Sequence, residues 1–150
     1  MMNLDFSIGG DRWRRSDRPL VLVVEREEEE LLLVSHILEL VGCSYAGTAN
    51  GEEAFRLAKT RQPAAILIEP YLRDNTGIDL VRRLKNDVTT RRIPLIALTV
   101  LATVDDLAML REAGCHACLT KPYAIEDLEA TLYRQFLAAD RASEPQKAAC

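Results

Sequence analysis

The 150-residue chain has no hydrophobic run long enough to cross a membrane. No apolar stretch approaches the ~20 residues that a transmembrane helix needs. The opening residues, MMNLDFSIGG, also lack the basic-then-apolar order of a signal peptide. The sequence therefore predicts a cytoplasmic protein with no membrane partner.

Positive charge is not in excess either, because the formal net charge is −4. A negatively charged domain repels the phosphate backbone of nucleic acid, so we expect no nucleic-acid partner. Apolar residues make up 48% and charged residues 28% of the chain, as in ordinary globular proteins. The length suits one domain with a sizeable core.

The seven glycines form none of the motifs that α/β enzymes commonly carry. The sequence has no G-x-G-x-x-G after a strand, no P-loop ending in Gly-Lys-Ser/Thr and no G-x-S-x-G nucleophile elbow. These absences disfavour dinucleotide binding, nucleoside triphosphate binding and hydrolase chemistry of the serine type.

Four cysteines are present, but their spacing favours ordinary thiols. Cys115 and Cys118 form a C-x-x-C within a predicted short strand, where residues three apart lie on opposite faces about 10 Å apart. A disulfide needs Cα atoms closer than about 7 Å. Zinc would need a second ligand pair, and His36 stands alone on a predicted helix.

What the sequence does contain is a regular alternation of strand-like and helical segments. Strands are predicted at 20–24, 44–49, 64–69, 95–99 and 116–120. Helices are predicted at 27–41, 52–60, 78–86, 104–113 and 125–138. This alternation predicts an α/β domain with a doubly wound, five-stranded parallel sheet covered by helices on both faces.

The flanking segments lack this pattern. Residues 1–18 are predicted to be a mobile N-terminal arm, residues 19–138 the domain, and residues 139–150 a flexible C-terminal tail. Trp13, the only tryptophan, is a candidate for docking on the body or on a partner. No output domain is expected after residue 138.

Polar residues at the carboxyl ends of parallel strands gather along one edge of the sheet, where ligands usually bind. In this sequence they follow the first, third, fourth and fifth predicted strands: Glu25, Arg26, Glu69, Thr99 and Lys121.

Several segments, in this order, resemble the response-regulator receiver domain of two-component signalling. They are LVLVVE, NGEEAF, PAAILIEPYLRDNTGIDLVRRLK, IPLIALT and AGCHACLTKPY. The resemblance covers residues 19–138 and implies the flavodoxin-like receiver fold, with strand order 2-1-3-4-5 and five helices. It also implies a site. In that family a histidine kinase supplies a phosphoryl group to an aspartate after strand three, and that aspartate and two acids after strand one hold Mg²⁺.

Part of the family's site is retained here. Thr99 and Lys121 match the pair that contacts the phosphoryl oxygens, and Lys121-Pro122 resembles a Lys-Pro bond that is often cis. Glu25 matches the first acidic position. If Mg²⁺ binds, the resemblance implies Glu25, Glu69 and the backbone carbonyl of Tyr71 as its ligands.

Three positions depart from the family. Arg26 replaces the second acid, Glu69 replaces the acceptor aspartate, and Cys118 replaces the aromatic residue that follows the switching Thr. Arg26 places a permanent cation where the metal would lie, so Mg²⁺ is doubtful and no metal is expected. We hypothesise that its guanidinium stands in for the metal by pairing with Glu69 or Glu25.

Glu69 extends its carboxylate about 1.5 Å further than aspartate would. Because phosphoryl transfer depends on exact placement of the acceptor, we expect acyl-phosphate formation to be negligible. The longer side chain is expected to reach towards Lys121 and Thr99 and to hold a fixed, active-like state.

The sequence therefore predicts a pseudo-receiver that is not an enzyme and acts by protein–protein contact in a phosphorelay. Its expected partners are a histidine kinase, a phosphotransfer protein or an output protein, with Tyr123 as a candidate interface residue. A homodimer through the helix-four to helix-five face is plausible. Three alternatives remain open: an inert scaffold, an active receiver that accepts a phosphoryl group with Mg²⁺, and a redox sensor acting through Cys118.

Overall fold

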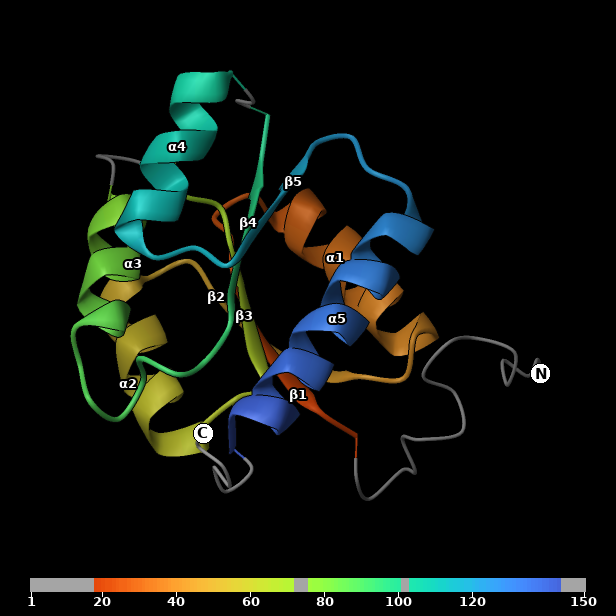
Figure 1. Ribbon diagram of the computed structural model, residues 1–150. Coiled ribbons are helices and arrows are strands. Elements are labelled where there is room, and N and C mark those ends of the chain that lie inside the picture. Colours follow the sequence, from red (N-terminus) through yellow and green to blue (C-terminus); the bar gives the residue numbers. More distant parts are fainter. Residues whose placement is uncertain (1–17, 72–75, 101–102, 144–150) are drawn as a thin grey trace.

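A computed structural model describes residues 18–71, 76–100 and 103–143 of the chain (Figure 1). The described residues form one five-stranded parallel sheet in the order β2-β1-β3-β4-β5. The strands are β1 (Leu20–Val24), β2 (Ser44–Thr48), β3 (Ala65–Ile68), β4 (Leu95–Thr99) and β5 (Ala117–Thr120). The predicted fold class and strand order are confirmed.

Helices cover both faces of this sheet (Figure 1). They are α1 (Glu28–Leu40), α2 (Gly51–Arg61), α3 (Thr76–Lys85), α4 (Val104–Ala113) and α5 (Ile125–Ser143). One apolar cluster joins α1 and α5 to the sheet, and a second joins α2, α3 and α4 to its other face. The sheet is therefore the middle layer of three.

The central strands β1, β3 and β4 are almost entirely buried, because helices lie over both of their faces. Alternate residues of β1 point to opposite sides. Val21 and Val23 belong to the cluster under α1 and α5, whereas Leu22 and Val24 belong to the cluster under α2, α3 and α4. This explains why these strands are continuous apolar runs in the sequence.

Side-chain caps fix the starts of two helices near the carboxyl edge of the sheet. Asn50 accepts the Glu53 N–H at 2.8 Å before α2. Thr103 accepts the Asp106 N–H at 3.0 Å before α4, and Asp106 accepts the Thr103 N–H in return. Each cap satisfies backbone N–H groups that a helix start otherwise leaves without a partner.

The C-terminal boundary differs from the prediction. Helix α5 continues to Ser143, so residues 139–143 are helical and the tail cannot begin at residue 139. Residues 1–17 of the predicted arm and residues 144–150 of the predicted tail lie outside the described residues. Within the described ranges, no helix is both long and apolar enough to span a membrane.

Candidate functional site

The predicted site residues follow neighbouring strands of the sheet. Backbone hydrogen bonds continue the ladder beyond the strands, since the Glu25 N–H donates to Thr48 and the Glu69 N–H to Val24, both at 3.0 Å. The Lys121 N–H likewise donates to the Thr99 carbonyl at 2.8 Å. The sheet therefore fixes the backbone from which each of these side chains projects.

The Lys121 ammonium lies at the centre of the site, between two buried carboxylates. Its Nζ atom is 3.2 Å from Glu25 Oε1 and 3.0 Å from Glu69 Oε1. The side chains of Lys121, Glu25 and Glu69 are 14%, 5% and 13% exposed. The structure thus brings together three predicted site residues as one charged cluster, with Glu25 buried and Glu69 and Lys121 largely so.

A further carboxylate approaches this cluster from α1. Glu30 Oε1 lies 3.7 Å from Lys121 Nζ, and the Glu30 side chain is 36% exposed. The sequence did not single out Glu30, because it is one of four consecutive acids at positions 27–30. Its signal was the position of Glu30 in the first turn after β1, beside the carboxyl edge of the sheet.

Burial and neighbouring charges shift the pKa values of Glu25 and Lys121 in opposite directions. Burial raises the pKa of Glu25 above its usual range, although the Lys121 charge works against this. Burial alone would lower the pKa of Lys121, but its hydrogen bond to Glu69 and the charge of Glu25 raise that pKa overall. Lys121 therefore stays a cation at neutral pH.

The second oxygen of Glu69 is held by the backbone. Glu69 Oε2 accepts the Tyr71 N–H at 3.0 Å. Gly77, near the start of α3, lies close against the same loop, because a Cβ at this position would be 2.5 Å from the Pro70 carbonyl oxygen and 2.7 Å from that of Glu69. Both oxygens of the acceptor-equivalent residue are therefore engaged, and the backbone at Glu69 and Pro70 lies close against Gly77.

Arg26 does not join the cluster, so the hypothesis that its guanidinium pairs with Glu69 or Glu25 is wrong. Arg26 Nη2 lies 3.7 Å from Glu27 Oε2, and the Arg26 side chain is 41% exposed. The physical reason is that Lys121 already binds both carboxylates, whereas burying a second cation would cost its hydration.

The other predicted residues lie around this cluster. Thr99 is fully buried at the end of β4, and the Lys121-Pro122 bond is cis. Tyr123 packs against the cluster under α1 and α5, and burial raises its pKa to about 12. Its hydroxyl oxygen is buried and has no hydrogen-bond partner in the described part of the chain. The role of Tyr123 as an interface residue stays a prediction.

The cysteine geometry corrects a second expectation. Cys115 and Cys118 do not lie on opposite faces, since both contact the apolar cluster under α2, α3 and α4 and line one hollow of about 160 Å³. Strand alternation fails here because β5 begins only at Ala117. Burial raises the pKa of Cys118, and it raises that of Cys115 to about 12. Little thiolate is available at neutral pH for redox chemistry.

The residues at the site fit Mg²⁺ poorly. Glu25 and Glu69 supply carboxylates, but one oxygen of each already accepts from Lys121. Mg²⁺ demands near-octahedral oxygen coordination at about 2.0–2.1 Å, and the third acid of the family's site is replaced here by Arg26. Among the residues that the structure describes, no group of three or more His, Cys, Asp or Glu side chains could hold a metal ion.

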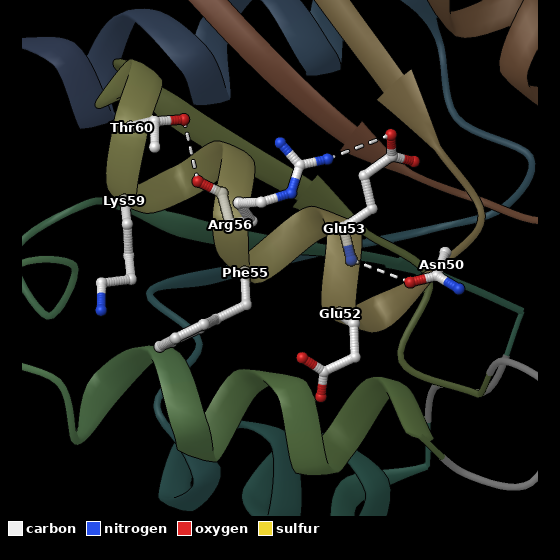
Figure 2. A pocket seen from close by; sticks show the side chains of 7 residues that line it. All are labelled: Asn50, Glu52, Glu53, Phe55, Arg56, Lys59 and Thr60. Atoms are coloured by element: carbon white, nitrogen blue, oxygen red, sulfur yellow. Dashed lines mark hydrogen bonds and ion pairs between the residues drawn. The ribbon is translucent and has the colours of Figure 1, made fainter.

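A separate hollow of about 710 Å³ lies along the outer side of α2 (Figure 2). Its charged groups are already paired, with Arg56 3.6 Å from Glu53 and Glu52 2.7 Å from Arg83. The Arg83 guanidinium also lies 3.9 Å from the centre of the Phe55 ring, a cation–π contact. The paired charges and the open shape make this hollow a weaker candidate site than the buried cluster.

Comparison with known proteins identifies the family. A sequence model of the response regulator receiver domain matches residues 21–133. The chain belongs to the response regulator receiver domain family. It therefore has the receiver fold of two-component signalling, and its family members are signalling proteins rather than classical enzymes.

Curated relatives include the polar-differentiation response regulator DivK of Brucella anthropi. That protein is 34% identical over 105 residues, which cover 70% of this chain and 85% of the relative. The DivK protein of Brucella melitensis is 33% identical over the same length and shares of both chains.

Solved structures of other receivers superpose on most of this chain. The receiver domain of sensor histidine kinase PA1611 from Pseudomonas aeruginosa, with a magnesium ion coordinated in its active-site cleft, is 28% identical with a TM-score of 0.73, covering 79% of this chain and 98% of that one. The signal receiver domain of a signal transduction histidine kinase from Syntrophus aciditrophicus is 29% identical with a TM-score of 0.75. That match covers 88% of this chain and 99% of the other.

Proposed function

We propose that this receiver domain signals by protein contact without being phosphorylated, and that the Glu25–Lys121–Glu69 cluster holds its pocket in one state. The observation that carries the proposal is the position of Lys121 Nζ, 3.2 Å from Glu25 and 3.0 Å from Glu69. Protein atoms alone supply both the anions and the cation of this pocket.

Glu69 also makes contacts of the kind that a bound phosphoryl group would make. One oxygen accepts from the Lys121 ammonium and the other from the Tyr71 backbone N–H. A carboxylate carries less charge than a phosphoryl group, which brings about −1.5 to −2 at neutral pH, so the likeness is one of contacts rather than of full charge.

Phosphorylation of Glu69 would be opposed by the same contacts. Acyl-phosphate formation needs one Glu69 oxygen as a nucleophile, and both oxygens already accept hydrogen bonds. The added negative charge would lie beside the Glu25 carboxylate, which is only 5% exposed. We therefore include independence from Mg²⁺ in the proposal.

The proposed partners are other proteins of a two-component pathway: a histidine kinase, a phosphotransfer protein or an output protein. A homodimer through the α4–β5–α5 face and a contact role for Tyr123 are part of the same proposal. So is a cytoplasmic location, with which the free thiols of Cys43, Cys115 and Cys118 agree.

Exposure to acetyl phosphate and Mg²⁺, followed by intact mass spectrometry, tests the proposal. The wild-type chain is expected to gain no phosphoryl adduct. The matched control is the double variant Arg26→Asp/Glu69→Asp, which restores the acidic pair and the acceptor and is expected to gain one. Calorimetric titration with Mg²⁺ should likewise detect binding to the double variant only.

An adduct that maps to Glu69 of the wild-type chain would show that the active-receiver alternative is right. A redox role for Cys118 has no support from a specific observation, because burial raises the pKa of this thiol and makes it less reactive.

A further inference from the structure

Helix α1 exposes a row of apolar side chains to solvent. Leu32, Leu33 and Leu40 are 59%, 51% and 52% exposed, and the exposed His36 lies between them along the helix. We call these four residues the leucine face of α1. The opposite side of the helix is buried in the core, so α1 is apolar on both sides. Exposed apolar patches of this kind mark interaction surfaces.

The flanks of the leucine face are acidic. Glu28, Glu29 and Glu39 are exposed and make no ion pair with any residue that the structure describes. The last turn of α1 carries no basic residue, so nothing on the helix balances the negative end of its dipole. A segment that binds this surface should be both apolar and basic.

The chain itself contains such a segment immediately before β1. The sequence DRWRRSDR, residues 11–18, contains Trp13 and four arginines against two aspartates. Residues 11–17 lie outside the described residues.

That starting point lies beside the C-terminal end of α1. The Pro19 carbonyl accepts the Ser44 N–H at 2.9 Å, and the Arg18 charge acts on the thiol of Cys43, which follows α1 closely. The described chain therefore begins near Cys43 and Ser44, a few residues after the C-terminal end of α1 at Leu40.

An extended segment 11–17 is long enough to span the leucine face of α1. Leu33 lies about 10 Å along the helix from Leu40, at 1.5 Å per residue. Trp13 lies five positions before Arg18 in the sequence. An extended chain spans about 17 Å over that length. Arg12, one residue further, can approach Glu29 in the first turn of α1.

We propose that residues 11–18 dock on the leucine face of α1 within the same molecule, with Trp13 against the leucines and the arginines beside Glu28, Glu29 and Glu39. The docked segment covers the exposed leucines. This proposal does not depend on the proposed function of the buried pocket.

Fluorescence of Trp13 tests the docking directly, because it is the only tryptophan of the chain. In the full chain we expect blue-shifted emission and weak quenching by acrylamide. Leu33→Glu should shift the docked-to-undocked ratio about tenfold, equivalent to about 1.4 kcal/mol, with red-shifted emission and stronger quenching. The matched control is Val88→Glu, since Val88 is 71% exposed in the connection between α3 and β4, and it should leave both readouts unchanged.

The charged part of the surface has its own control. Glu28→Gln/Glu29→Gln should weaken docking at low salt, whereas Glu112→Gln, at an exposed acid of α4, should not. Circular dichroism of each variant checks that the fold is intact.

Three results would overturn the proposal. They are solvent-exposed Trp13 emission in the wild-type chain, equal responses to Leu33→Glu and Val88→Glu, and a blue shift that disappears on dilution. The last would indicate docking on a second copy of the chain.

Discussion

Replacing Lys121 with methionine tests the balance of charge in the pocket most directly. The variant keeps the length and apolar stem of the side chain but removes the cation between Glu25 and Glu69. These two carboxylates are only 5% and 13% exposed, so water cannot replace the lost ammonium well. Breaking a buried ion pair on one side typically costs about 3–5 kcal/mol.

The cost of protonating a carboxyl group in the variant gives a similar loss of unfolding free energy. The variant can relieve the unpaired charge by protonating a carboxyl group whose ordinary pKa is 4.5. Holding such a group neutral at pH 7 costs about 1.4 kcal/mol per pH unit, or roughly 3 kcal/mol. We therefore expect Lys121→Met to lower the free energy of unfolding by about 3–4 kcal/mol at pH 7.

Urea denaturation followed by circular dichroism measures this loss. Lys59→Met is the matched control, because Lys59 is 43% exposed and its contact with Asp87 is 3.8 Å long. A surface pair of this kind is worth less than about 1 kcal/mol. The cost of Lys121→Met should shrink as the pH falls towards 4.5, where protonating the carboxyl groups becomes nearly free.

Two outcomes would refute the reasoning: equal costs for the two lysine variants at pH 7, or a cost for Lys121→Met that does not change with pH. Either would mean that Glu25 and Glu69 are better solvated, or paired with another cation, than the contacts of Lys121 indicate.

Two further predictions concern the same pocket. Burial raises the pKa of Glu25, so the folded state holds this proton more tightly than the unfolded state does, and the free energy of unfolding should fall as the pH rises from 4.5 through the raised value. Glu25→Gln should remove that part of the slope, and stability curves that stay parallel from pH 4.5 to 7 would contradict the assignment. Gly77→Ala should cost about 1–3 kcal/mol in urea denaturation, because its Cβ would meet backbone oxygens at 2.5 and 2.7 Å. Gly51→Ala, where a Cβ meets nothing within 4 Å, should cost nothing, and a similar loss for both would exclude the proposed clash.

The fold was predictable from the sequence because burial on both faces leaves a local signal. The runs of β1, β3 and β4 are apolar without alternation, and α1 and α2 are followed closely by Gly42 and Pro63. The end of α5 also had a local signal, which the predicted end at residue 138 did not use. Pro145 disfavours helical backbone at the residue before it, in agreement with the observed end at Ser143.

The candidate site was predictable as a set of positions but not as a set of contacts. Parallel topology places Glu25, Glu69 and Lys121 at one edge whatever their side chains do. Which cation binds the carboxylates depends on competition between Arg26 and Lys121, and that competition is decided by desolvation, which residue order does not reveal. Cys115 was misplaced for a related reason, because strand alternation was extended past the first residue of β5.

The departures from the family's site change both its charge and the length of its acceptor. The resemblance implies three acids and one lysine, a net negative site that a divalent ion balances. Here Lys121 lies between Glu25 and Glu69, with Glu30 at 3.7 Å, whereas Arg26 pairs with Glu27 outside this cluster. Glu69 alone would lengthen the acceptor without removing the need for a metal, and Arg26 alone would weaken metal binding while leaving an acceptor of ordinary length. For that reason the control for phosphorylation has to restore both positions together. If charge balance and acceptor reach are separate requirements, neither Arg26→Asp alone nor Glu69→Asp alone should become phosphorylated.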